Sequence, residues 1–138
     1  MKTTLSRELI FALILLVGLG VLPPATPLAA RQATLLDARV SKVIDGDTFT
    51  MKGVSRHIRV WGLDAPEKGD PGGTAATAAM RGLITGATLH CELHDIDRYG
   101  RYVGQCFLPD GRDIAAEMIR AGVATEYCQY SRGYYGTC

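Results

Sequence analysis

The chain has 138 residues, with 47% hydrophobic residues, 21% charged residues and a formal net charge of +1. This length suits one domain with a removable leader. The small net charge argues against a stable genome-binding protein, because proteins that hold DNA over many phosphates carry a clear positive excess.

The first thirty residues are typical of a secretory signal peptide. Lys2 and Arg7 make the start positive, residues 9–22 are apolar without interruption, and small residues follow in the segment 25–30. As a helix the apolar run would be roughly 21 Å long, short of the roughly 30 Å of a bilayer core. We therefore expect a signal peptide at residues 1–30, cleaved after Ala30, with an uncleaved N-terminal membrane anchor as the alternative.

Without this leader the chain at residues 31–138 keeps 13 basic and 13 acidic side chains. A neutral domain predicts that any contact with nucleic acid is short and made by a few placed arginines. This favours an enzyme that acts on a small stretch of backbone.

Five strands and two helices are expected in the exported domain. Alternating and β-branched residues predict strands at 38–44, 48–52 and 55–63, and then at 88–93 and 102–108. Between the third and fourth strands, Thr74 is expected to cap a helix that runs to about residue 85, and Asp113 to cap a second helix that ends at Gly122. Five short strands with a helix after the third indicate an α+β fold, a five-stranded OB-like β-barrel with two packed helices.

The stretch 43–67 organises the chain, because it gathers charged residues beside turns. Asp47, Asp64 and Glu67 occur there with Arg59 between them. Carboxylates gathered in this way repel one another unless a cation lies among them, and oxygen ligands select Ca²⁺ or Mg²⁺ over zinc. An arginine beside such an ion suits a phosphate oxygen. The stretch predicts a metal-assisted phosphodiester site.

The third strand presents a geometric difficulty for this site. Strict alternation along a strand places Arg59 and Asp64 on opposite faces. They can meet only where the strand bends before Asp64, and Gly62 is the expected position of that bend.

The four cysteines all follow the leader: Cys91, Cys106, Cys128 and Cys138. An even number in an exported chain favours two disulfides, for which the sequence alone allows three pairings. Cys91 and Cys106 flank a turn almost symmetrically, so a hairpin would place them opposite each other and leave Cys128 and Cys138 to close the C-terminus. A zinc site with His90 and His94 is disfavoured, because residues four apart on a strand lie about 13 Å apart.

Three separated motifs resemble the staphylococcal nuclease (thermonuclease) family. They are VIDGDT at 43–48, IRVWGLDAPE at 58–67 and DRYGR at 97–101, and the segment 110–124 is similar to the second helix of the family. The resemblance runs from about residue 39 to residue 130. It implies an OB-barrel with helices packed on it, and cleavage of DNA and RNA with little sequence preference that leaves 3′-phosphate ends.

By this resemblance, Ca²⁺ is the cofactor and Asp47 and Asp64 are its carboxylate ligands. Ala65 stands where the family commonly has threonine, but its backbone carbonyl can still bind the ion. Arg59 and Arg101 resemble the two arginines that hold the scissile phosphate. Oppositely charged groups at such a phosphate lower the barrier to attack by water.

The resemblance also assigns the remaining site residues. Glu67 resembles the acid that activates or orients the attacking water. Tyr99 resembles an aromatic residue that lines the nucleotide pocket, and Tyr130 is matched to a second one. We expect an exported monomer, periplasmic or secreted, without a stable protein partner, and bound to a membrane only if the leader is uncleaved.

Two other functions are compatible with the same fold. The first is a nucleic-acid-binding OB module that has lost catalysis, against which the intact charged positions argue. The second is a disulfide-stapled domain that binds a protein partner, in which case replacement of the arginines and of Glu67 would leave its activity unchanged.

Overall fold

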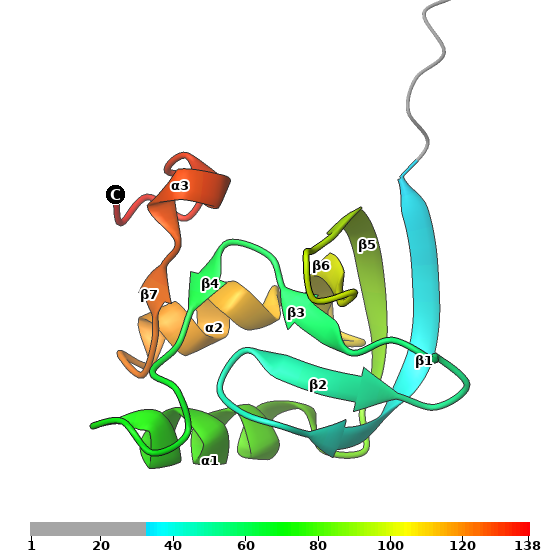
Figure 1. Ribbon diagram of the computed structural model, residues 1–138, viewed down its shortest axis with the longest axis horizontal. Coiled ribbons are helices and arrows are strands. Elements are labelled where there is room, and N and C mark those ends of the chain that lie inside the picture. The colour runs from blue at the N-terminus through cyan, green and yellow to red at the C-terminus, as the bar shows by residue number, and fades with distance from the viewer. Residues whose placement is uncertain (1–32) are drawn as a thin grey trace, which may run out of the picture. The chain divides into compact units, whose positions relative to one another are not determined.

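The computed structural model describes residues 33–138 (Figure 1). The expected signal peptide lies outside the described residues. Within residues 33–138, none of the helices is long and apolar enough to cross a membrane.

A closed barrel of five strands forms the body of the domain, as the sequence predicted. Its strands follow the order β1-β2-β3-β6-β5, with β1 at Thr34–Val43, β2 at Thr48–Met51, β3 at Ile58–Val60, β5 at Thr88–Ile96 and β6 at Tyr102–Phe107. Every neighbouring pair is antiparallel except β3 and β6, whose parallel pairing joins distant parts of the sequence. Closure leaves the barrel without an unpaired edge between these strands.

Strand β1 begins earlier than its sequence pattern indicated. The sequence predicted the first strand only from residue 38, but residues 34–37 also pair with residues 90–93 of β5. The partner strand supplies this order, because cross-strand pairing stabilises residues whose own pattern is weak.

The barrel encloses an apolar core to which helices α1 and α2 contribute. Its largest fully buried side chains are Phe49, Ile58, Leu63, Met80, Ile84, Leu89, Ile114 and Met118. Burial of such side chains stabilises the fold by about 1.5–3 kcal/mol each. Helix α1 (Gly73–Ile84) packs against β1 and α2, and helix α2 (Ile114–Arg120) packs against β6 (Figure 1).

The two helices begin in different ways. Asp113 caps α2 as predicted, since its Oδ1 accepts hydrogen bonds from the amides of Ala115 and Ala116 at 2.8 and 3.3 Å. The predicted cap of α1 by Thr74 is wrong, because the capping position is Gly72 in the left-handed conformation (φ 86°). Without a side-chain cap, this glycine turns the chain into the helix.

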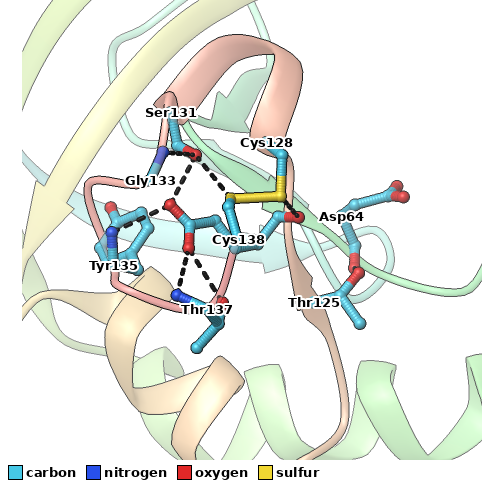
Figure 2. The surroundings of a disulfide bond; sticks show 9 residues. Asp64, Thr125, Cys128, Ser131, Gly133, Tyr135, Thr137 and Cys138 are labelled. Atoms are coloured by element: carbon cyan, nitrogen blue, oxygen red, sulfur yellow. Dashed lines mark hydrogen bonds between the residues drawn. A yellow bond between two sulfur atoms is a disulfide. The ribbon is translucent and has the colours of Figure 1, made fainter.

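A second, two-stranded sheet lies beside the barrel and was not predicted. Strand β4 (Leu63–Asp64) pairs with β7 (Thr125–Glu126), and the short helix α3 (Cys128–Ser131) follows. Figure 2 shows the Cys128–Cys138 disulfide that closes this C-terminal segment. The predicted Cys91–Cys106 disulfide is also present, and it joins directly opposed positions of β5 and β6.

The carboxylate of Glu126 holds the chain after α3. It accepts hydrogen bonds from the Ser131 hydroxyl at 2.6 Å, the Tyr135 amide at 2.9 Å, and the amide and hydroxyl of Thr137 at 2.8 and 2.9 Å. Burial raises the pKa of Glu126, but these hydrogen bonds outweigh it and lower the pKa to about 2. The C-terminal segment is thus fixed by one carboxylate and one disulfide.

Candidate functional site

Asp47 lies immediately before β2, at the end of a tight turn. The side chain of Asp45 accepts a hydrogen bond from the Asp47 amide at 3.0 Å, which stabilises this turn. The buried Asp47 carboxylate accepts hydrogen bonds from the Thr48 hydroxyl at 2.9 Å and from the Ala65 amide at 3.3 Å. It therefore joins the turn before β2 to the segment that follows β4.

Burial raises the pKa of Asp47 to about 6, although the Arg59 guanidinium beside it acts in the opposite direction. The surrounding protein groups therefore do not fully offset the cost of burying the negative charge of Asp47. A divalent cation would favour its ionised form, and carboxylate and carbonyl oxygens are ligands that Ca²⁺ prefers. The carboxylate of Asp47 therefore suits a hard cation.

Such a cation would be bound by few protein carboxylates. Within residues 33–138, no group of three or more His, Cys, Asp or Glu side chains is placed to hold a metal ion. The predicted ligands are two carboxylates and one carbonyl, so a bound cation would take its remaining oxygens from water and substrate.

Arg59 is the central residue of β3 and connects the motif at 43–48 to the segment that follows β3. Its Nη2 lies 3.1 Å from Oδ2 of Asp47, and its Nη1 donates hydrogen bonds to the carbonyls of Leu63 and Val60 at 2.7 and 3.0 Å. The chain between these carbonyls wraps around the guanidinium. The bend predicted at Gly62 is confirmed, since β3 ends at residue 60 and Gly62 has a φ of 68°.

Arg101 is positioned by a tight loop between β5 and β6. Oδ1 of Asp97 accepts hydrogen bonds from the amides of Tyr99 and Arg101 at 2.9 and 3.0 Å, and its Oδ2 accepts one from Nε of Arg101 at 2.7 Å. Burial alone would raise the pKa of Asp97, but these hydrogen bonds and the charge of Arg101 lower it. Gly100, with a φ of 77°, completes the turn.

A hydroxyl connects this loop to the rest of the site. Nη1 of Arg101 lies 3.5 Å from Oγ1 of Thr48, which itself donates to Asp47. Arg59, Asp47, Thr48 and Arg101 thus form one continuous polar cluster. The antiparallel pairing of β2 with β3 places Thr48 opposite Arg59, and the parallel pairing of β3 with β6 brings the distant loop of Arg101 beside them.

Asp64 and Ala65 follow Arg59 along the chain, and only Ala65 of the two is in hydrogen-bond contact with this cluster among the described residues. Ala65 touches it directly through its amide, whereas the side chain of Asp64 is exposed. The carbonyl of Asp64 accepts a hydrogen bond from Thr125 Oγ1 at 3.4 Å, so strand β7 holds this segment from its other side (Figure 2).

Glu67 lies in an exposed loop. Its carboxylate makes no hydrogen bond or ion pair with any other residue in the part of the chain that the structure describes. The loop backbone is closely packed, since a Cβ atom on Gly73 would overlap the Glu67 carbonyl. The position of Glu67 is thus defined by the backbone of its loop.

Tyr99 and Tyr130, which are predicted to bind the nucleotide, contact different residues. Tyr99 is exposed, with the guanidinium of Arg101 5.3 Å and that of Arg98 4.8 Å from its ring centroid. Tyr130 on α3 is also exposed and packs edge-on against Tyr127 at 4.7 Å. Only Tyr99 belongs to a segment that contacts the polar cluster.

Sequence reasoning did not identify Thr48 and Asp97 as members of the site. Thr48 links the carboxylate of Asp47 to Arg101, and Asp97 holds Arg101 through both its backbone and its side chain. For Asp97 a signal was present, because an aspartate two residues before a turn tends to accept hydrogen bonds from its own following amides. For Thr48 no signal was available, since its role depends on the closure of the barrel.

Comparison with known proteins supports a single family. The family profile described as "Staphylococcal nuclease homologue" matches residues 57–137. An uncharacterized endonuclease of Escherichia coli O157:H7 is 39% identical over 98 residues, which cover 70% of this chain and 64% of that protein. The succinoglycan biosynthesis protein ExoI of Rhizobium meliloti is 32% identical over 108 residues, covering 70% of this chain and 56% of that protein.

Another relative is named as a nuclease. A probable staphylococcal-like nuclease of Oryza sativa subsp. japonica is 37% identical over 75 residues, covering 54% of this chain and 22% of that protein. This chain therefore spans less than two thirds of the length of each of these three relatives. With the barrel and the family profile in agreement, the chain belongs to the staphylococcal nuclease family.

Proposed function

We propose that this protein is a calcium-dependent endonuclease that hydrolyses DNA and RNA with little sequence preference and leaves 3′-phosphate ends. The observation that carries the proposal is the continuous cluster of Arg59, Asp47, Thr48 and Arg101. It presents two guanidinium groups beside a carboxylate that suits a cation.

The two arginines suit a phosphodiester, which resists hydrolysis because its negative charge repels the nucleophile. That charge grows in the transition state, so fixed cationic donors stabilise the transition state more than the substrate. Arg101 is held by Asp97, and Arg59 by Asp47 and two carbonyls, so little reorganisation is needed when the phosphate binds.

Glu67 is proposed to accept the proton of the attacking water. The water oxygen forms a bond to phosphorus, and the bond from phosphorus to the 5′ oxygen breaks. The 5′ oxygen takes up a proton from solvent and leaves as a hydroxyl, while the phosphate remains on the 3′ side. An exposed carboxylate without protein partners among the described residues is free to approach a water molecule on the bound substrate.

Calcium would be held by the carboxylates of Asp47 and Asp64 and by the carbonyl of Ala65. When bound, the ion supplies charge that stabilises a non-bridging phosphate oxygen. The departure from the common threonine at Ala65 retains the carbonyl and removes only a hydroxyl.

The decisive experiment incubates the oxidised protein with single-stranded DNA and with RNA, in calcium or in an excess of chelator. We expect cleavage of both polymers in calcium only, 3′-phosphate ends, and a loss on the order of 100-fold or more in kcat for Arg59→Ala. Arg112→Ala, an exposed arginine on the turn before α2, is the control and should be unaffected. Binding without calcium-dependent cleavage would instead indicate a nucleic-acid-binding module.

We further propose that the protein is exported to the periplasm or secreted. The support is that all four cysteines are paired in disulfides, which persist in oxidising compartments. Detection of the oxidised protein in an extracytoplasmic fraction, by alkylation and mass spectrometry, would test this location.

A further inference from the structure

An open pocket of about 440 Å³ lies next to Arg101, on the side where the β2–β3 turn approaches the β5–β6 loop. Its volume is within the range of about 300–1,000 Å³ that is usual for ligand sites. The residues that line it are Ser55, Arg56, His57, Tyr99, Gly100 and Arg101. None of these side chains is acidic, and three of them can carry positive charge.

The two walls of the pocket are fixed to each other. Nη1 of Arg56 donates a hydrogen bond to the carbonyl of Gly100 at 2.7 Å, and its guanidinium lies 5.7 Å from the ring centroid of Tyr102. The amide of Tyr102 donates to the carbonyl of His57 at 2.9 Å. The pocket is therefore a fixed feature of the seam between β3 and β6.

The pocket combines two kinds of nucleotide contact. Arg56 and Arg101 supply guanidinium groups of the kind that bind phosphate oxygens. The exposed ring of Tyr99 supplies a flat surface on which a base can stack. If Arg56 only supported the loop, neither the exposed ring of Tyr99 nor the open pocket beside it would be needed.

We propose that this pocket binds the nucleotide adjacent to the cleaved phosphodiester, with Arg56 on the flanking phosphate and Tyr99 against the base. The proposal rests on the proposed function, because Arg101 marks the position of the scissile phosphate. It adds Arg56 as a substrate-binding residue, with single-stranded nucleic acid of at least three nucleotides as the ligand that fills the pocket.

Because Arg56 donates a hydrogen bond to Gly100, an experiment must distinguish phosphate binding by Arg56 from its support of the β5–β6 loop. If Arg56 only supports the loop that carries Arg101, its removal should lower kcat on every substrate. If it binds a flanking phosphate, its removal should raise KM only for substrates that possess that phosphate. A dinucleotide with a single phosphodiester has no flanking phosphate and distinguishes the two roles.

The test compares wild type with Arg56→Ala and Arg56→Lys, and uses Arg81→Ala, an exposed arginine in the last turn of α1, as the charge-matched control. The substrates are the dinucleotide and oligonucleotides extended by one nucleotide at either end. For one of the two extensions we expect Arg56→Ala to raise KM on the order of tenfold, with kcat within about twofold and the dinucleotide unaffected. The extra nucleotide should still lower KM in part in Arg56→Lys, and to the full wild-type extent in Arg81→Ala.

A binding measurement keeps the proposal separate from the nuclease assignment. Fluorescence anisotropy of a labelled six-nucleotide DNA, in calcium and a Glu67→Gln background, gives the dependence of log K on log salt. Loss of one phosphate contact in Arg56→Ala should reduce this slope by about 0.7, whether or not the wild type cleaves. An unchanged slope, or equal losses on the dinucleotide and the longer substrates, would overturn the proposal.

Discussion

Replacement of the Cys128–Cys138 disulfide by two serines should destabilise the whole domain. Both cysteines are exposed, so serine at these positions creates no buried cavity. The bond closes a loop with a sequence separation of 10 residues. For a loop of this length, restriction of the unfolded chain contributes about 2.7 kcal/mol to the free energy of unfolding.

This stabilisation should reach the rest of the domain because the C-terminal segment packs on it. The Tyr135 hydroxyl donates a hydrogen bond to Asp113 Oδ2 at 3.0 Å, and Asp113 is the residue that caps α2. Strand β7 also pairs with β4, which carries Asp64. Release of the segment would therefore disturb a helix of the core and one edge of the site.

Equilibrium urea unfolding at neutral pH measures the effect, with Gln129→Ser in the same short helix as the control. We expect the double variant to lose about 2.7 kcal/mol, or roughly 10–20 °C in Tm for a domain near this size, and the control to change by less than about 0.5 kcal/mol. A double variant as stable as the wild type would show that the C-terminal segment unfolds independently and would refute the coupling.

Three further outcomes are expected. Arg101→Lys should lower kcat on single-stranded DNA on the order of 100-fold, because an ammonium group cannot reproduce the donor fork, and a change in KM alone would contradict this role. The contribution of Glu126 to stability is complete above about pH 4.5 and is lost as the pH falls toward 2, because the pKa of Glu126 is lowered in the folded state. In acid unfolding, the stability of Glu126→Gln should therefore lack this loss between about pH 4.5 and pH 2. Gly62→Ala should lower the free energy of unfolding by more than about 1 kcal/mol, because the residue has a φ of 68° and the new Cβ would lie 2.9 Å from a tyrosine ring. Gly53→Ala, with a φ of 76° and open space around it, should show only the backbone cost. Equal losses of stability in urea unfolding would contradict the steric argument.

Local sequence signals predicted the parts of the structure that depend on near neighbours. Cys91 and Cys106 flank their turn symmetrically, and antiparallel pairing placed them opposite each other. Gly62 marked the bend after β3 because only glycine adopts that backbone conformation without strain. Asp113 stood immediately before an apolar helical pattern and caps it.

Features that depend on distant contacts were not predicted. Strands β4 and β7 have two residues each, too few to show alternation, and they exist because they pair with each other. The role of Thr48 requires the β5–β6 loop to reach it across the barrel. At the start of α1 the local signal was misleading, because the left-handed Gly72 takes the position expected for Thr74.

The parallel pairing of β3 with β6 has a consequence for when the proposed activity can arise. Arg59 lies in one of these strands and Arg101 immediately precedes the other, so 41 intervening residues must fold before the two guanidinium groups can face the same phosphate. An unfinished or unfolded chain therefore carries every acid of the site and yet lacks the assembled charge. The proposed hydrolysis of nucleic acids therefore requires that β3 and β6 have paired, because the two guanidinium groups come together only at that seam.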